Sequence, residues 1–142
     1  MSTLQPDAVM RTWFEEVWIQ GREDSIDKLF SATAMAHGLP GGPTQGPGAF
    51  RSVFKLFRGA FPDIHIDVEK TVVEGDYVTV MCRVTGTHTG PTLGFAPTGR
   101  HIDFNGMVLA RVAYGQFLEG WNCFDFLTMY QQLGIVPPAP GA

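Results

Sequence analysis

The chain has 142 residues, of which 44% are hydrophobic and 17% charged, and its formal net charge is −4 at pH 7. This length and composition predict one ordinary globular domain, spanning residues 1–142. An acidic chain without a basic run argues against nucleic acid as a partner. No apolar stretch approaches the roughly 20 residues of a membrane-spanning helix, so a membrane is not expected as a partner either.

Two cysteines, Cys82 and Cys123, lie in strand-like segments without metal-ligand spacing. We predict reduced thiols, no metal site and a cytoplasmic location, because no basic segment followed by an apolar run marks a secretory signal. The glycines lack the spacing of a phosphate or dinucleotide loop, so no cofactor is predicted.

The first sixty residues predict three helices and one short strand, at residues 3–20, 22–30, 47–60 and, for the strand, 35–38. Trp13 and Trp18 belong to the broad apolar stripe of the first helix, which we expect to cover a curved sheet. Residues 39–48 are rich in Gly and Pro and predict a loop. Pro62 ends the Phe-rich third helix.

From residue 63 onward, apolar and polar residues alternate, which is the pattern of half-buried strands. Four long strands are predicted, at residues 63–69, 77–89, 101–112 and 116–127. Residues 129–134 predict a short helix or turn, and residues 137–142 a loose tail. Helices followed by strands indicate the α+β class, with a strongly bent antiparallel sheet, helices on its concave face and a deep apolar pocket between them.

Alternation along the last strand places Trp121, Cys123 and Asp125 on one side. A carboxylate among aromatic residues favours a pocket wall, where desolvation would raise its pKa and allow acid–base catalysis. The alternative is structural: Asp125 hydrogen-bonds a backbone amide or caps the turn that follows.

Two histidines could donate to a carbonyl group of a substrate. His88 lies at a strand end on the apolar face, and His37 precedes the Gly/Pro loop. Each is equally compatible with a structural role. On the strand at 101–112, the even-numbered residues form the cleaner core face, which puts Asp103 outside unless a bulge near Asn105 reverses the faces.

We expect the pocket wall to combine residues of the first helix, the end of the third helix and the last two strands. The candidates are Phe14, Trp18, Phe61, Phe104, Val108, Trp121 and Cys123.

Short motifs recur along the chain in a specific order. They are His37 with the Gly-rich loop, Phe61-Pro62-Asp63, Glu74-Gly75-Asp76-Tyr77-Val78, Gly86-Thr87-His88-Thr89-Gly90, Pro97-Thr98-Gly99-Arg100, Arg111-Val112, Glu119 with Trp121 and Asp125, and Gln132-Leu133-Gly134. In this order, the chain resembles the SnoaL-like polyketide cyclase (ester cyclase) family of the NTF2-like superfamily.

The resemblance implies a cone-shaped α+β barrel with a deep apolar pocket, commonly in a homodimer or homotetramer. It also implies an Asp on the last strand that serves as acid and base for an aldol ring closure without metal or cofactor. Asp125 matches that position, and His37 and His88 match positions that often face the pocket. Val108 departs from the family, which often has a polar residue there.

Three functions follow as hypotheses. The first is a cofactor-independent cyclase, lyase or isomerase that acts on a hydrophobic carbonyl compound through Asp125. The second is a non-catalytic small-molecule binder or interaction module that uses the same cavity. The third is an epoxide hydrolase similar to limonene-epoxide hydrolase, which requires Asp103, an arginine (Arg83 or Arg111) and Asp125 to converge around a water.

Overall fold

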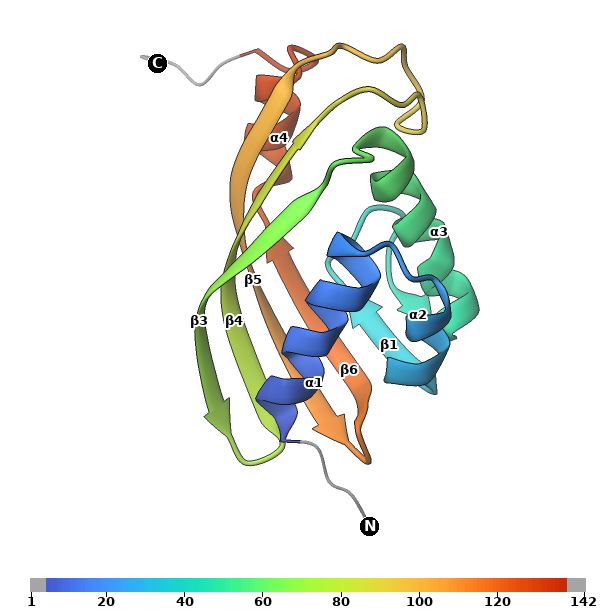
Figure 1. The fold of residues 1–142 in the computed structure, drawn as a ribbon, viewed down its shortest axis with the longest axis vertical. Coiled ribbons are helices and arrows are strands. Elements are labelled where there is room, and N and C mark those ends of the chain that lie inside the picture. Colours follow the sequence, from blue (N-terminus) through green and yellow to red (C-terminus); the bar gives the residue numbers. More distant parts are fainter. Residues whose placement is uncertain (1–4, 138–142) are drawn as a thin grey trace.

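A computed structural model describes residues 5–137 of the chain (Figure 1). The helices of this part are α1 (Pro6–Thr12), η1 (Trp13–Ile19), α2 (Asp24–Leu29), α3 (Gly46–Ala60) and α4 (Phe126–Gln132). The strands are β1 (Phe30–His37), β2 (Thr44–Gln45), β3 (His65–Glu74), β4 (Tyr77–Thr87), β5 (His101–Ala113) and β6 (Gln116–Phe124). The predicted α+β class is confirmed. Apart from Pro137, the predicted tail lies outside the described residues.

All six strands form one curved sheet in the order β2-β1-β6-β5-β4-β3. Neighbours from β3 to β6 are antiparallel, as predicted, whereas β1 pairs parallel with β6. The sheet is not closed, because β2 and β3 remain as its two edges. No helix within residues 5–137 is long and apolar enough to cross a membrane.

The helices α1, α2 and α3 lie over one face of the sheet, with α4 at the end of β5 (Figure 1). The Phe-rich stripe of α3 is buried against this concave face through Phe50, Phe54 and Phe57. Burying each such side chain contributes about 2 kcal/mol, so this stripe is a main source of stability.

The predicted first helix consists of two segments with different helical geometry. After α1, the chain continues as a π-helix, η1, in which the Gln20 N–H donates to the Glu15 carbonyl at 2.9 Å. In an α-helix, Trp13 and Trp18 would project about 140° apart, because successive residues turn by about 100°. The wider π turn brings both indoles to the buried side, where each is 7% exposed.

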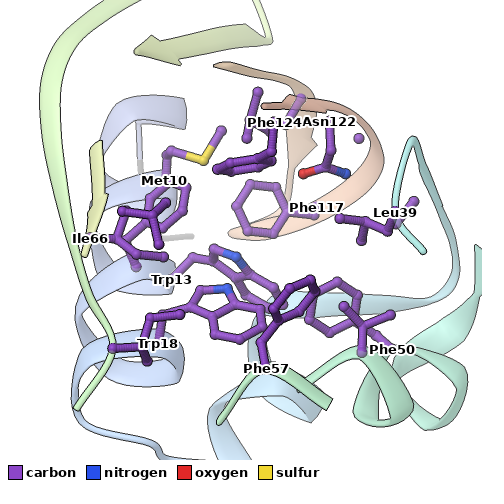
Figure 2. A pocket seen from close by; sticks show the side chains of 18 of the residues that line it. Met10, Trp13, Trp18, Leu39, Phe50, Phe57, Ile66, Phe117, Asn122 and Phe124 are labelled. Atoms are coloured by element: carbon purple, nitrogen blue, oxygen red, sulfur yellow. The ribbon is translucent and has the colours of Figure 1, made fainter. Parts of the chain in front are cut away.

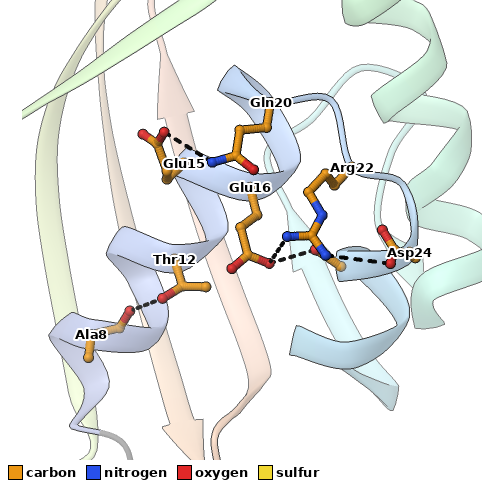
Figure 3. Close-up of polar contacts among 8 residues, drawn as sticks. Ala8, Thr12, Glu15, Glu16, Gln20, Arg22 and Asp24 are labelled. Carbon is orange, nitrogen blue, oxygen red and sulfur yellow. Dashed lines mark hydrogen bonds and ion pairs between the residues drawn. The ribbon is translucent and has the colours of Figure 1, made fainter.

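Polar contacts hold the turn from η1 into α2 (Figure 3). The buried Ser25 hydroxyl donates to Glu16 Oε1 at 2.7 Å, and the Arg22 guanidinium lies 3.7 Å from the same oxygen. Arg22 also lies 3.8 Å from Asp24 Oδ2. Because the Glu16 carboxylate is bound on two sides, the end of the π-helix has a fixed position over the sheet.

A β-bulge interrupts the β5–β6 hairpin. Val112 pairs with Phe117, but Arg111, the residue before it, pairs with Glu119. Leu118 therefore has no partner on β5 and is the extra residue of the bulge. Side chains alternate with a period of two, and one extra residue therefore reverses the face of every residue that follows.

The reversal corrects the predicted faces of the last strand. Asn122 pairs with Val108 and points toward the helices, as does Phe124, whereas Trp121 and Cys123 lie on the opposite, exposed face. The strand also ends at Phe124 rather than at residue 127, because Asp125 leaves it to begin α4.

Candidate ligand-binding site

A cavity lies between η1, α3 and the concave face of the sheet (Figure 2). The space between its lining side chains is about 820 Å³, counting the part open to solvent. Five of the expected pocket residues lie on its wall, namely Phe14, Trp18, Phe61, Phe104 and Val108.

The wall is apolar almost throughout. Apart from the indole N–H groups of Trp13 and Trp18, the polar side chain on the wall within residues 5–137 is that of Asn122. No carboxylate, histidine or basic side chain of the described residues lines it. A cavity of this kind binds mainly by removing apolar surface from water, and Asn122 gives it one point of polar specificity.

Asn122 is held in a fixed orientation. Its Nδ2 donates to the His37 carbonyl at 2.9 Å, so the amide bridges β6 to the end of β1. The amide projects into the space near Phe117, Phe124 and Leu39 (Figure 2). Its Oδ1 atom and second N–H have no hydrogen-bond partner among the described residues, which leaves both for a ligand.

Asp125 lies outside the cavity, which corrects its predicted placement. Its Oδ1 accepts from the Thr128 N–H at 3.0 Å and its Oδ2 accepts from the Thr128 hydroxyl at 2.6 Å. The residue is thus the N-cap of α4, as the structural alternative predicts. These bonds, first from the Thr128 hydroxyl and then from its N–H, lower the pKa of Asp125, opposite to the rise expected from desolvation.

Removal of this cap gives a testable effect on stability. We expect Asp125→Ala to lower the free energy of unfolding by about 1 kcal/mol, because the Thr128 N–H loses its acceptor, and Asp125→Asn to cost less. A lowered folded-state pKa contributes stability above the usual carboxyl pKa of about 4 that is lost as pH falls through the folded value. Urea unfolding at neutral and acidic pH measures both; equal stability of Asp125→Ala and wild type at neutral pH would contradict the cap.

His37 also lies outside the cavity, on the exposed face of the sheet. Its Nε2 is 2.8 Å from Glu119 Oε2, and its ring stacks on Trp121 at 5.7 Å. The backbone carbonyl of His37, rather than its ring, reaches the site through Asn122. The structure therefore does not bring the imidazole together with Asp125 in a pocket.

His88 is fully buried but lies behind the cavity wall, between the rings of Phe61 and Phe95 at 5.5 and 5.3 Å. The Thr98 N–H donates to its Nδ1 at 3.0 Å, so that atom is an acceptor and the neutral ring carries its proton on Nε2. Nε2 has no partner among the described residues. The backbone of His88 also bonds to Arg100, so the residue holds the loop that precedes β5.

Asp103 faces outward, where parity predicts it, and Asn105 is exposed on the same face. The Asp103 carboxylate accepts from the Arg83 guanidinium, with one bond of 2.7 Å. Asp103, the arginines and Asp125 do not meet in the cavity, so the arrangement that an epoxide hydrolase needs is not formed.

No group of His, Cys, Asp or Glu side chains in the described part could hold a metal ion. Cys82 is buried in the core, and burial raises the pKa of its thiol to about 12. Cys123 is free and exposed.

A curved sheet with helices over its concave face and an apolar cavity between them defines an NTF2-like fold, which is shared by ketosteroid isomerase-like proteins. The chain belongs to the SnoaL-like polyketide cyclase family, whose model matches residues 8–133. No curated protein matches it in sequence.

Solved structures of the same family are similar along nearly the whole chain. A proposed SnoaL-like polyketide cyclase from Jannaschia sp. CCS1 is 26% identical, with 94% of both chains covered and a TM-score of 0.83. IdmH, a proposed polyketide cyclase from Streptomyces antibioticus, is 28% identical over 92% of this chain and 99% of that chain, with a TM-score of 0.80. A proposed polyketide cyclase from Bacillus cereus ATCC 10987 is 30% identical over 90% and 79%, with a TM-score of 0.77.

Sequence reasoning missed Asn122, because uninterrupted alternation assigns it to the outer face. One signal could have found it. Phe117 and Phe124 are both large apolar residues suited to a core, yet they are seven positions apart and would fall on opposite faces of a regular strand. Placing both inside requires a bulge between them, and that bulge also turns Asn122 inward.

Proposed function

We propose that the protein binds a largely apolar small molecule of the polyketide type in this cavity, and that Asn122 hydrogen-bonds to a hydroxyl or carbonyl group of it. The observation that carries the proposal is an apolar cavity whose wall holds one amide fixed by the backbone of β1. The relatives described as proposed polyketide cyclases support the same ligand class.

The hydrogen bond from Asn122 to His37 determines which atoms of the amide remain for a ligand, and therefore which ligand groups can bind there. A ligand hydroxyl or enol donates to Oδ1, and a carbonyl accepts from the second N–H. Either bond forms away from bulk water, where leaving the amide unpaired against an apolar ligand costs about 1–3 kcal/mol. The site should therefore discriminate oxygenated ring systems from hydrocarbons of the same shape.

Ring closure is the second candidate function, favoured by family membership. In an aldol-type closure, a carbon–carbon bond forms, the α-carbon loses a proton and the attacked carbonyl oxygen gains one. Asn122 is placed to donate to that oxygen as negative charge develops on the oxygen. The cavity walls hold the substrate in the folded conformation that ring closure requires. In this proposal the α-proton passes to water rather than to Asp125, whose carboxylate bonds to Thr128 at the surface.

A fluorescence titration tests the binding site. Trp13 and Trp18 line the cavity, so an occupant changes their emission. We expect 2-naphthol to bind about fivefold more tightly than naphthalene, since one hydrogen bond contributes about 1 kcal/mol. Asn122→Leu should remove this preference and retain naphthalene binding.

Asp125→Asn is the matched control, because it changes a carboxylate to an amide at an exposed position outside the cavity. Its preference for 2-naphthol should equal that of wild type. The proposal fails if neither compound binds, or if Asn122→Leu keeps the preference. Loss of binding in Asp125→Asn would instead support a direct role of that carboxylate.

We also infer that the protein works in a reducing compartment such as the cytoplasm. Both cysteines are free thiols, and Cys123 is exposed. An exposed thiol persists where the environment is reducing.

A further inference from the structure

Two indole N–H groups on the cavity wall, those of Trp13 and Trp18, make no hydrogen bond within residues 5–137. Both side chains are more than nine-tenths buried, with 7% of each exposed. In the described part of the chain, the polar side-chain atoms that lack a partner and are also sealed from solvent are Thr44 Oγ1 and His88 Nε2. The indole nitrogens are not sealed in this way, so open space reaches them, and the cavity beside their rings provides it.

Phenylalanine rings surround both indoles. The rings in contact with one or both of them are those of Phe30, Phe50, Phe54, Phe57 and Phe117. Hydrocarbon rings supply no oxygen or nitrogen acceptor, and a buried N–H without an acceptor costs free energy. Phenylalanine at positions 13 and 18 would avoid that cost, as it does elsewhere on this wall. The two N–H groups therefore indicate a partner from outside the fold.

The π-helix places the two donors on the same part of the wall. Trp13 and Trp18 are five residues apart, which is the i to i+5 spacing of the π-helical hydrogen bond. Both rings contact Phe50, with ring centroids 5.0 and 6.1 Å away. Single π turns of this kind occur frequently at functional sites.

Asn122 lies on the other side of the cavity. It belongs to β6 of the sheet, whereas the indoles come from η1 above the concave face. In Figure 2 the two indoles lie at the foot of the cavity and the Asn122 amide at its upper edge. A ligand that spans the cavity therefore meets the amide at one end and the indoles at the other.

The chemistry of the indoles defines the group that they bind. An indole N–H donates and cannot accept, so its partner is a hydrogen-bond acceptor. No basic side chain of the described residues lines the cavity, and a carboxylate would lose its hydration there without a countercharge. A carbonyl oxygen is neutral and has two lone pairs, so it can accept from one indole or from both.

We propose that Trp13 and Trp18 form a second polar contact of the cavity, which binds a carbonyl oxygen of the ligand across from Asn122. The inference rests on the proposed function, because it concerns the other end of the same ligand. It narrows the ligand class to compounds with oxygen atoms at both ends. The group at Asn122 is a hydroxyl or a carbonyl, and the group at the indoles is a ketone-type or quinone-type acceptor.

The indole N–H resonances of the wild-type protein give a direct test, because the chain has three tryptophans and each contributes one signal. The probes are 6-acetyl-2-naphthol and 6-isopropenyl-2-naphthol, which have the same shape and the same hydroxyl, but only the first carries a ketone. We expect the ketone to shift the indole protons of Trp13 and Trp18 downfield relative to the isopropenyl compound. Trp121, on the opposite face of the sheet, should show no difference.

Trp13→Phe and Trp18→Phe keep an aromatic ring and remove the donor. In each variant the ratio of the ketone affinity to the isopropenyl affinity should fall about fivefold, the value of one hydrogen bond. Trp121→Phe is the matched control and should leave the ratio unchanged. The carboxylate 6-hydroxy-2-naphthoate should bind wild type more weakly than the ketone.

The outcomes separate this inference from the proposed function. If neither naphthol binds, both fail. If both naphthols bind but give the same indole shifts, or if the Trp13 and Trp18 variants keep the wild-type ratio, the inference fails alone and the preference at Asn122 stands. Tighter binding of the carboxylate than of the ketone also overturns it, because the site would then accept a charge.

Discussion

Gly38→Ala is expected to lower the free energy of unfolding by about 3–5 kcal/mol. Gly38 has a φ of +82°, where a side chain costs about 1–2 kcal/mol. A Cβ there would also lie 2.0 Å from the Asn122 carbonyl oxygen, a backbone atom of β6. The strand that carries Asn122 must therefore move, and large effects of this kind arise where backbone cannot yield.

Gly41→Ala separates the two causes. Gly41 has a similar φ of +91°, but a Cβ there meets nothing within 4 Å. It should lose about 1–2 kcal/mol from backbone conformation alone. Urea unfolding followed by tryptophan fluorescence measures both variants. Equal losses would show that the close approach of Gly38 to β6 does not contribute to the destabilisation by alanine.

The close approach at Gly38 connects stability to the site. It lets the end of β1 lie against β6, so that the His37 carbonyl reaches Asn122, and it directs Leu39 onto the cavity wall. Gly38→Ala should therefore also reduce the preference for a hydroxylated ligand, whereas Gly41→Ala should leave it unchanged.

The strongest periodic patterns predicted their elements well. The Phe stripe of α3 and the even-numbered core face of β5 follow the sequence because hydrophobic burial dominates there. The same alternation correctly placed Asp103 outside, paired with Arg83. In α3 the buried residues recur every three to four positions, and in β5 they recur every second position, so each pattern predicts its own element.

Two features were missed when the chain was interpreted with regular helical and strand periods. The first is the π-helix, because the broad apolar stripe of the sequence includes both Trp13 and Trp18 even on a regular helix, where they project about 140° apart. The selection is made by tertiary packing, in which Trp13 meets Phe50 and Phe117, and Trp18 meets Phe54. Those contacts join segments far apart in the chain.

The second feature is the bulge, which determines which residues of β6 face the cavity. The family resemblance correctly identified the fold, and it directed attention to Asp125. Whether a residue faces a cavity, however, depends on counting residues from a fixed register, and one extra residue at Leu118 reverses the count. Asn122 and Trp121 exchanged faces as a result, which placed the Asn122 amide on the cavity wall and exposed the Trp121 indole on the opposite face of the sheet.

Deletion of Leu118 is expected to keep the faces of β6, because Phe117 still pairs with Val112 and Glu119 with Arg111 once the extra residue is gone. Phe117, which is 5% exposed and lies 5.3 Å from the Trp13 ring, stays buried, and Phe124 stays on the cavity wall. The free energy of unfolding should therefore fall by less than about 2 kcal/mol.

Leu118→Ala is the matched control, since it keeps the residue count and removes part of one half-buried side chain, with an expected loss below about 1 kcal/mol. Urea unfolding compares the two variants, and maleimide labelling shows whether Cys123 keeps its exposed face, which we expect in both. A loss above about 3 kcal/mol together with an unreactive Cys123 in the deletion variant would contradict the bulge, because in a hairpin without an extra residue the deletion reverses every face beyond it. The register of β6 thus determines both the position of Asn122 in the cavity and the exposure of Trp121 on the opposite face.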